Sequence, residues 1–561
     1  MFVRVKTNRE NQRHSVQIVH SVRKGKKVSQ QIIRHVGIAY DERELEQLKD
    51  VAESIKIKME NTVQPPLFSL EELEGLKAIP GSKEMKSNES TAPYQVNLKE
   101  VLEEERVISG IHDIYGKLFD EMGYSEVIDS QVGQSHPKIV KIFKDVVLAR
   151  ITLPLSKHAT VEMLAEDFGI TLPLHKVYRM MDKVDDEAIK RLNQLSHRNT
   201  RSLFGHPLDV VFFDATTLYF ESFEEDDLRR LGYSKDMKFN QPQVLLALLV
   251  TREGLPVGYK VFQGDTYEGH TLVPILEELK RDYQIKRVVF VADSGMLSRE
   301  NLNHLESQGF EYIVGARLKN MPESIKSQIL DKSHYVSVSE EGDRLDVAEF
   351  NYCPPRRLIV SYKEKRARKD RLDREKAILK LKKKLDKNRN QKSYLSNYGY
   401  KKYLKIEGES RIQLDEKKIE QDSRWDGLHG VITNIVDFNP IEVLEYYSNL
   451  WTVEESFRIT KHDLKVRPVF HWNPARVKAH IAIVFTAYSL VRYMTYRVKL
   501  KYKKLSPQRI RKALLKVQTS IIYDTKKKIR YGLPSKTNED AKRIYDVFKV
   551  DRVLTPYIIS S

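Results

Sequence analysis

Residues 447–461 read Tyr-Ser-Asn-Leu-Trp-Thr-Val-Glu-Glu-Ser-Phe-Arg-Ile-Thr-Lys. At 3.6 residues per turn, this pattern predicts a helix on which several polar side chains share one stripe. The stripe consists of Tyr447, Glu454, Arg458, Lys461 and Lys465, spaced seven, four, three and four residues apart. An acid among bases can hold a metal ion while the bases bind phosphates. A salt-bridged surface helix is the alternative, because Glu–Arg pairs at this spacing are common.

Two further acids follow apolar runs that predict short buried strands. Asp214 follows Val-Val-Phe-Phe, and Asp293 follows Val-Val-Phe-Val-Ala. We expect each carboxylate at the end of its strand, at the sheet edge where α/β proteins place their ligand sites. A single Asp in this position is more often a turn or a helix cap. Two of them together with Glu454 form a set of hard oxygen ligands suited to Mg²⁺ or Mn²⁺.

This constellation resembles that of the DDE transposases of bacterial insertion sequences, which have an RNase H-like catalytic core. The likeness is to the group with a β-rich insertion before the Glu and the signature Tyr, two residues, Arg, three residues, Glu, six residues, Lys. Tyr447, Glu454 and Lys461 fit this spacing, and Leu450 stands where the group has Arg. The likeness spans roughly residues 200–495, and the N-terminal region resembles that of the larger members.

Glu455 is the alternative acid on the predicted helix. Choosing it would place Ser448 and His462 at the Tyr and Lys positions of the signature, so the spacing favours Glu454. Leu450 removes one phosphate contact of the group and leaves the three acids in place.

The resemblance implies an α/β fold: an RNase H-like mixed sheet interrupted by a large insertion domain and preceded by a small β-hairpin/α region and a helical domain. It implies that Asp214, Asp293 and Glu454 hold two Mg²⁺ or Mn²⁺ ions, about 4 Å apart, across the scissile phosphate. The DNA contacts that it implies on the helix are those of Tyr447, Arg458, Lys461 and Lys465.

The implied reaction is cut-and-paste transposition, in which double-stranded DNA is cleaved at terminal inverted repeats and joined to target DNA. In this group the freed 3′-hydroxyl commonly forms a hairpin with the opposite strand, and we expect a homodimer in the DNA complex. Two alternatives remain: a nuclease such as a junction resolvase, which cuts without strand transfer, and an inactive DNA-binding remnant. The long insertion argues against the first alternative, and retention of all three acids argues against the second.

The composition agrees with a nucleic-acid partner. The chain has 561 residues, a formal charge of +18 at pH 7 and a sequence pI near 9.4. Such an excess of positive charge favours polyanions. A single cysteine, Cys353, excludes an intramolecular disulfide framework and a Cys₄ zinc site. No signal peptide is apparent, and the apolar stretch 480–494 is shorter than the ~20 residues of a membrane span, so it predicts a buried helix. We expect a cytoplasmic protein associated with the nucleoid.

The N-terminal residues predict a β-hairpin with strands at 15–22 and 27–36, followed by a helix capped by Asp41. A stretch rich in Pro, Gly and Ser then predicts a linker. The expected domains are 1–60 (hairpin and helix), 61–96 (linker), 97–200 (helical, with a possible role in DNA-end binding), 201–320 (first half of the catalytic core), 321–428 (basic insertion), 429–500 (second half of the catalytic core, with the Glu454 helix) and 501–561 (C-terminal, helical).

Two short helices at 159–168 and 174–184, joined at Gly169, are predicted within the helical domain. A helix-turn-helix would point Lys176, Arg179 and Lys183 at DNA, and an ordinary helical bundle is an equal alternative because no strong fingerprint is present.

The region predicted to form the catalytic core shows strand patterns interrupted by helix patterns. The order is strands at 208–214, 217–221, 244–251 and 256–263, helix 271–283, the Asp293 strand, helix 298–308, strand 312–316 and a returning strand from 430. Asp293 and Glu454 lie 161 positions apart, a gap that predicts the insertion.

The insertion carries a strongly basic run. Residues 363–392 contain 15 Lys or Arg and 5 Asp or Glu. A solvated helical arm is the ordinary interpretation of such a run. Its position beside the core favours an arm that grips DNA through Lys380, Lys382, Lys383 and Lys384. Trp425 is a candidate for stacking on an unpaired base, although a partly buried ring in a turn is the more common situation.

Overall fold

The computed structural model describes residues 2–8, 13–24, 27–39, five positions between 45 and 56, and 94–559. Within the last range it omits 129–135, 205–209, 222, 223, 233–239, 267–270, 272, 276, 278–280, 282–288, 294–297, 341, 342, 386–401, 408–410, 468, 503 and 504. The chain forms two compact units, Met1–Gln95 and Val96–Ser561.

The first unit is built on an antiparallel sheet of three strands in the order β1-β2-β3. Its strands are β1 (Phe2–Asn8), β2 (Arg13–Lys24) and β3 (Lys27–Ala39). The β2–β3 pairing confirms the predicted hairpin, and β1 was not predicted. Val16 and Ile18 of β2 pack against Ala52, from the segment predicted as a helix. The predicted cap Asp41 and the linker up to residue 93 lie outside the described residues.

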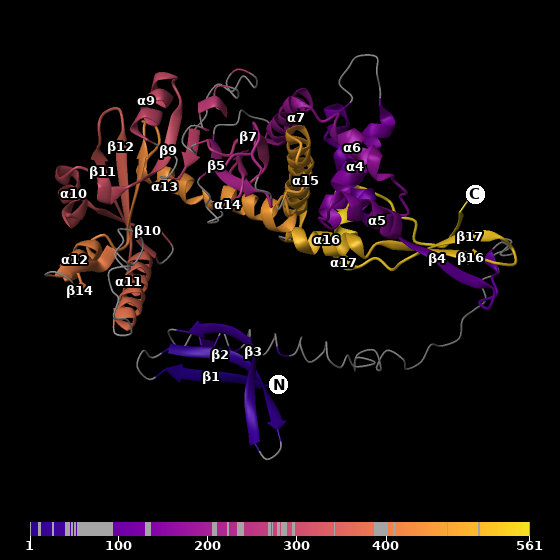
Figure 1. Ribbon diagram of the computed structural model, residues 1–561, viewed down its shortest axis with the longest axis horizontal. Helices are drawn as coiled ribbons and strands as arrows, with labels where there is room; N and C mark the ends of the chain where they lie inside the picture. Colours follow the sequence, from indigo (N-terminus) through magenta and orange to yellow (C-terminus); the bar gives the residue numbers. More distant parts are fainter. Residues whose placement is uncertain are drawn as a thin grey trace. The chain divides into compact units, whose positions relative to one another are not determined.

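A nine-stranded mixed sheet forms the centre of the second unit, in the order β10-β11-β12-β15-β9-β8-β5-β6-β7 (Figure 1). Its core strands are β5 (Val210–Tyr219), β6 (Gln243–Val250), β7 (Pro256–Gln263), β8 (Val289–Ala292) and β9 (Glu311–Ala316). β5, β6 and β7 are antiparallel neighbours, whereas β8 runs parallel to β5 and β9 parallel to β8. This mixed α/β arrangement confirms the predicted fold class.

β5 differs from its prediction, because the two runs expected at 208–214 and 217–221 form one strand. Asp214 therefore lies in the middle of a strand rather than at its end. The reason is that β5 has two neighbours of different length. Its parallel ladder with β8 ends at Phe212, while its antiparallel ladder with β6 continues to Tyr219.

The insertion adds strands to the same sheet rather than forming a body of its own. β10 (Val336–Glu340), β11 (Asp343–Asn351) and β12 (Arg357–Lys363) form an antiparallel edge. The returning strand β15 (Leu428–Thr433) pairs with β12 on one side and β9 on the other. Leu358 and Val360 of β12 share a hydrophobic core with β5, β8 and β9.

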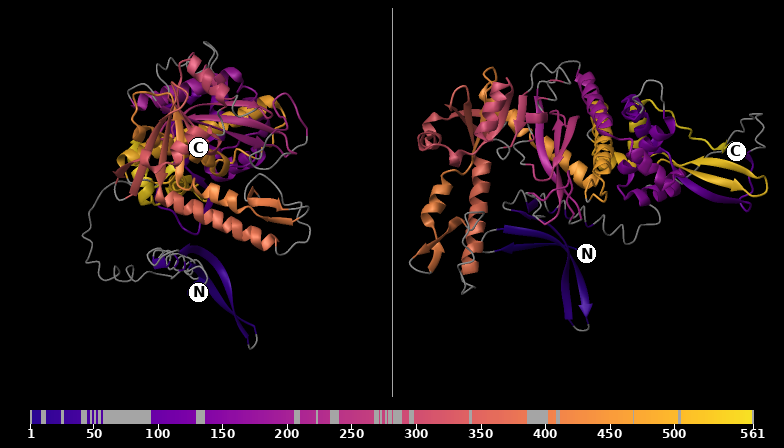
Figure 2. Two further views of the ribbon diagram at one scale, coloured as in Figure 1. Left: turned by 90° about the vertical axis from the view of Figure 1, so that its left-hand side faces the viewer. Right: turned by 45° about the horizontal axis from the view of Figure 1, so that its top comes forward.

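One portion of the insertion projects from this edge as an arm (Figure 2). The arm consists of α11 (Glu364–Leu385), β13 (Leu404–Glu407), β14 (Arg411–Leu414) and α12 (Glu416–Ser423). Leu381 of α11 packs against Tyr403 and Leu404 in a small core of its own. The basic run thus begins as a long helix held by a hairpin.

α14 (Trp451–Arg458), α7 (Asp186–Phe204) and α15 (Pro474–Lys501) pack against β5, β6 and β7 of the sheet. α4 (Pro137–Thr152), α5 (Lys157–Phe168) and α6 (Leu174–Met181) pack against α15 and against one another, and they belong to the same large hydrophobic cluster. Most of α15 is buried, which confirms the helix predicted from 480–494. Within the described ranges, none of the helices combines the length and the apolar character that crossing a membrane requires.

α5 and α6 match the predicted helix pair. Gly169 ends α5 with a φ of 64°, a left-handed conformation that glycine adopts without strain. Lys176, Arg179 and Lys183 are exposed. Contact of these side chains with DNA stays a prediction.

The expectation of purely helical ends for the second unit was wrong. β4 (Val101–Ile108) begins the region expected to be helical, and it pairs with β16 (Gln518–Asp524). β17 (Ile529–Pro534) and β18 (Tyr557–Ile559) complete this four-stranded sheet, with α16 (Pro507–Leu515) and α17 (Glu539–Phe548) beside it in the chain. Pairing across more than 400 residues leaves no local signal in the sequence.

Shorter elements complete the second unit. They are α3 (Lys117–Glu121), α9 (Arg299–Ser307), α10 (Glu323–Leu330), α13 (Pro440–Ser448), π-helical turns at His112–Gly116 and Ile459–Asp463, and 3₁₀ turns at Tyr124–Val127, Leu318–Asn320 and Lys332–His334.

Candidate active site

Asp214 lies in β5, and Asp293 directly follows the end of the neighbouring parallel strand β8, at the same level. In the β5–β8 ladder, Phe212 pairs with Val291, and each aspartate comes two residues after its member of this pair. Successive side chains on a strand point to opposite faces, so residues two apart share a face. Phe212 and Val291 belong to the core cluster that includes α14. Both carboxylates are therefore directed to the face of the sheet on which α14 packs.

Glu454 lies on α14 above this face. Val453 and Phe457 of the same helix are buried in the core, and the helix contacts β5 and β6. Glu454 itself is exposed. An amphipathic helix with this pattern must turn Val453 and Phe457 inward, which leaves Glu454 at the side of the contact.

The prediction that Tyr447, Glu454, Arg458, Lys461 and Lys465 share one continuous helix is wrong. α13 ends at Ser448, and the Asn449 side chain donates a hydrogen bond of 2.8 Å to the Glu445 carbonyl, which competes with the regular helical pattern. Beyond α14 the helix widens into the π-helical turn, and Lys465 has a φ of 43°. Tyr447 therefore lies on a different helix from Glu454, and Lys465 lies outside both helices.

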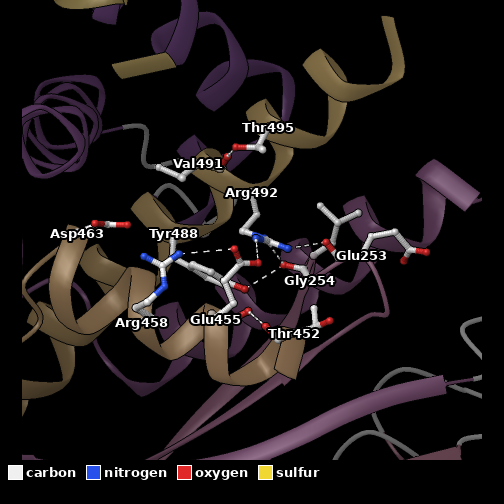
Figure 3. A network of polar contacts seen from close by, with 12 residues as sticks. Glu253, Gly254, Thr452, Glu455, Arg458, Asp463, Tyr488, Val491, Arg492 and Thr495 are labelled. Carbon is white, nitrogen blue, oxygen red and sulfur yellow. Dashed lines mark hydrogen bonds and ion pairs between the residues drawn. The ribbon is translucent and has the colours of Figure 1, made fainter. Parts of the chain in front are cut away.

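Glu455, the alternative acid, points away from the aspartates. Its carboxylate forms an ion pair of 3.2 Å with Arg492 of α15 and one of 3.6 Å with Arg458 (Figure 3). Arg492 also donates to the carbonyls of Gly254 and Glu253, at 2.7 Å and 2.6 Å. Glu455 thus belongs to a network that joins α14 to α15 and to the turn after β6.

Glu454 and Asp293 line the same cavity, which has a volume of about 470 Å³. Tyr447 lies at this cavity, and its hydroxyl donates a hydrogen bond of 3.4 Å to Asp293 Oδ1. Two cations of the insertion, Lys363 and Arg366, lie on its wall. The cavity thus brings acids of the core together with bases of the insertion.

A lysine of the π-helical turn after α14 contacts β5 close to Asp214 in the chain. Lys461 donates a hydrogen bond to the Thr216 hydroxyl, on the same face of β5 and two residues from Asp214. Asp214 Oδ1 accepts a hydrogen bond of 2.8 Å from the Ala215 backbone N–H. Lys461 therefore lies against β5 two residues along the strand from Asp214, and Arg366 lines the same cavity as Asp293.

Burial shapes the protonation of the groups beside Asp293. It raises the pKa of the Tyr447 hydroxyl above its usual value, and the Asp293 charge raises this pKa further, so the hydroxyl keeps its proton and can donate. The pKa of His429 is lowered to about 4 by burial and by the nearby Arg366. His429 is therefore neutral at pH 7, with its ring 5.1 Å from that of Tyr447.

Asp214, Asp293 and Glu454 have the oxygen chemistry that divalent cations require, because carboxylates are preferred ligands of Mg²⁺ and Mn²⁺. Asp214 and Asp293 suit a shared cation, because they lie at the same level and are directed to the same face of the sheet. Among the residues that the structure describes, no three His, Cys, Asp or Glu side chains come close enough to bind one ion together.

Two family models match this chain. The model described as "Transposase DDE domain" matches residues 205–490, which is just over half of the 561 residues. The model described as "IS1634 family transposase, N-terminal domain" matches residues 3–66. This chain belongs to the DDE transposase family.

Two solved structures of Mos1 transposase show a similarity to this transposase. For "Mos1 transposase paired-end complex with left transposon end", identity is 14%, coverage is 36% of this chain and 64% of the Mos1 chain, and the TM-score is 0.14. For "Crystal structure of the Mos1 mariner paired end complex with Mn", identity is 16%, coverage is 39% of this chain and 69% of the Mos1 chain, and the TM-score is 0.14. The match spans less than two thirds of the first Mos1 chain. No curated protein matches the transposase.

The cations expected to bind DNA fall into three places in the transposase. Arg458, the last residue of α14, is exposed, and so is Lys465, which lies beyond the π-helical turn. Lys461 is half-buried and contacts β5 through Thr216. Lys380, Lys382 and Lys383 are exposed on α11. Lys384 belongs to the same helix, and its side chain lies outside the described residues.

Trp425 lies in the turn between α12 and β15, and its ring packs against the core cluster that contains Leu358 and Val360. This is the partly buried position that is common for such a ring.

Sequence reasoning missed three side chains at the cavity of the transposase: His429, Lys363 and Arg366. His429 is the second residue of β15 and Lys363 is the last of β12, at the same end of two antiparallel neighbours. Only the pairing of these strands brings them to Asp293. Lys363 and Arg366 belong to the basic run 363–392, which was the available signal for both.

Proposed function

We propose that this transposase cuts DNA at the ends of its insertion sequence and joins the freed 3′ ends to target DNA. The observation that supports this proposal is the placement of Asp214 and Asp293 on one face at the same level of parallel strands, with Glu454 of α14 packed on that face. Like charges repel, so carboxylates that three separate elements direct to one face favour a bound cation.

In the proposed role, Asp214, Asp293 and Glu454 hold two divalent cations, which supply positive charge to the scissile phosphate and acidify a bound water. In the first step, the water oxygen bonds to phosphorus and the bond from phosphorus to the 3′-oxygen breaks. The 3′-oxygen takes up a proton, and the 5′-phosphate stays on the flanking DNA. In the second step, the new 3′-hydroxyl attacks a phosphorus of the target strand and loses its proton, and the target 3′-oxygen leaves.

The neighbouring residues hold the substrate in this scheme. Lys461 stands beside Asp214 and can neutralise a non-bridging phosphate oxygen next to the scissile bond. The Tyr447 hydroxyl, which keeps its proton, can donate to a phosphate oxygen or orient Asp293. Lys363 and Arg366 place positive charge on the opposite wall, where the second DNA strand or the target can lie.

The test uses the terminal inverted repeats that flank the gene. A labelled duplex carrying one repeat is incubated with the full-length protein, Mg²⁺ and a target plasmid, and the products are resolved on a denaturing gel. We expect nicked ends first and joined products later. If the protein nicks its ends efficiently and never joins them, it acts as a nuclease and the proposal fails.

A further inference from the structure

A second cavity, of about 510 Å³, lies apart from the acids. It is enclosed by the end of α4, the beginning of α5, α15 near its first turns and the segment after the π-helical turn. Its basic lining consists of Arg150, Lys157, His158, Lys465, Arg467, His471 and His480, and Ser156 and Tyr178 add hydroxyl groups. Among the described residues that line it, none is an Asp or a Glu.

Three of these basic groups are buried to an unusual degree. The exposed fractions are 6% for Arg150, 5% for Lys157 and 5% for His480. Lys157 Nζ lies 3.2 Å from His480 Nδ1, while His480 Nε2 lies 3.2 Å from the Val466 carbonyl. A carbonyl can only accept, so Nε2 carries the proton and Nδ1 accepts from Lys157. Within the described ranges, neither Arg150 nor Lys157 pairs with a carboxylate.

Burying cations without an anion costs free energy, so a protein usually pairs such groups. Here burial makes these groups less basic, and for Lys157 and His471 the charges of neighbouring bases add to the effect. Burial and the charge of Arg150 lower the pKa of Lys157, and burial lowers the pKa of Arg150 to about 10. Burial and the charge of Lys157 lower the pKa of His471 to about 4. An anion in the cavity would reverse these effects.

The cavity is linked to Asp214 along β5. Three residues beyond α14 contact this strand: Lys461 bonds Thr216, the Arg467 guanidinium lies 5.5 Å from the centre of the Tyr219 ring, and Val469 bridges Phe220 in parallel. Asp214 and Tyr219 are five residues apart, which is about 17 Å in an extended strand. That distance is about five base-pair steps of B-DNA, at about 3.4 Å per step.

We propose that this cavity binds one backbone phosphate of the DNA duplex, about five base pairs from the phosphate that is cut. Arg150, Lys157 and His480 form its floor, and Lys465 and Arg467 form its rim. α5 begins at the cavity, so the positive end of its dipole adds to the attraction for an anion. The assignment of the phosphate to DNA rests on the proposed function, whereas the affinity for a phosphate group does not.

The first experiment uses inorganic phosphate and no DNA. Thermal unfolding of the full-length protein is followed in chloride and in phosphate at equal ionic strength and pH. A ligand of the folded state raises the midpoint as its concentration rises, so phosphate should raise that of the wild type. Lys157→Met should unfold in chloride at or above the wild-type midpoint, because it removes a buried unpaired cation, and should lose most of the rise in phosphate.

Lys99→Met, at an exposed lysine before β4, is the matched control and should keep the wild-type rise. The proposal is overturned if phosphate does not raise the unfolding midpoint of the wild type. It is also overturned if phosphate raises the midpoint of Lys157→Met as much as that of the wild type. If the buried variant does not fold, Lys465→Gln at the exposed rim replaces it. Lys465→Gln should show a reduced rise, and an unchanged rise overturns the proposal equally.

The second experiment uses a duplex with the terminal inverted repeat and measures the association constant at several salt concentrations. Each phosphate contact contributes about 0.9 to the slope of log K against log salt. Lys157→Met should lower the slope by about that amount, while Lys99→Met should leave it unchanged. A phosphate-dependent rise in the midpoint with an unchanged slope would assign the cavity to a free phosphate and refute the DNA assignment. Failure of strand transfer leaves both readouts intact, so the two proposals can fail separately.

Discussion

Adjacent glutamates on α14 have different surroundings, and this difference can be tested directly. Glu454 lines the cavity with Asp293, while Glu455 pairs with Arg492. We expect Glu454→Gln to abolish Mg²⁺-dependent cleavage of the labelled end with little change in stability. Glu455→Gln should keep cleavage and lower the free energy of unfolding by about 1.5–3 kcal/mol, the usual range for a hydrogen bond to a charged group.

Urea unfolding and the gel assay measure the two effects side by side. Asp293→Asn, which also keeps its shape and loses its charge, is the positive control for loss of cleavage. Robust cleavage by the Glu454→Gln protein would show that the acid has been assigned to the wrong residue.

Lys461 offers a second test at the residue scale, because it is held against β5 beside Asp214. Only strand transfer requires the 3′ end to stay in place for a second attack, so a phosphate clamp matters more for joining than for nicking. Lys461→Ala should therefore reduce joined products from a pre-nicked end by about tenfold or more, the loss expected for about 1.4 kcal/mol, while reducing first-strand nicking less. Thr216→Val, which removes only the hydroxyl partner of the lysine, should give a smaller effect of the same kind. Equal losses in both steps would contradict this role.

The elements that carry the three candidate acids could be predicted from sequence, since a local apolar pattern marks each strand or helix, and their catalytic role stays a proposal. The residues that surround these acids could not be predicted from sequence. His429 and Arg366 reach Asp293 only because β12 pairs with β15, a contact between segments more than 60 residues apart. Arg150, Lys157 and His480 come from three helices whose packing no local pattern encodes.

At the scale of elements, α11 makes the clearest prediction. Lys380, Lys382 and Lys383 are exposed on a helix that projects from the sheet edge. Changing all three to Glu should weaken binding of duplex DNA and lower its salt slope by about 0.9 for each phosphate that the variant no longer binds.

Lys326→Glu with Lys332→Glu, on and after α10 in the same insertion, alters the net charge by two thirds of that amount and serves as the control. The slope is obtained from fluorescence anisotropy of a labelled duplex at several salt concentrations. A slope equal to that of the control would show that the basic run only keeps the helix solvated.

Elements were predicted well where a local period exists and poorly where a single interaction ends or joins them. Between α13 and α14 the backbone N–H groups of Leu450 and Thr452 bond to the carbonyls three residues earlier, so two turn residues interrupt the expected helix. β5 is continuous because β6 pairs with it beyond the last contact with β8. β4 and β16 are strands because they pair with each other.

At the scale of the whole molecule, buried histidines link stability to pH. Burial, with a smaller contribution from the charge of Arg201, lowers the pKa of His197 to about 4 in the folded protein. An exposed histidine in the unfolded chain has a pKa near about 6.5. Between these values the unfolded chain binds more protons than the folded protein, so the free energy of unfolding decreases as the pH falls through this window. Above the pKa of the unfolded chain, His197 is neutral in both states, so it no longer lowers the free energy of unfolding.

His197 is 6% exposed, so its full effect should be measurable, at up to about 1.4 kcal/mol for each pH unit inside the window. We expect urea unfolding of the wild type to show a lower free energy at about pH 5 than at about pH 7.5. His197→Gln removes the titrating group and should show a smaller difference between these two pH values, whatever its stability at the higher pH. His158→Gln, at an exposed histidine on α5, should keep the wild-type difference. An equal pH difference in His197→Gln and the wild type would mean that His197 titrates alike in both states, and its burial would then have no role in acid sensitivity.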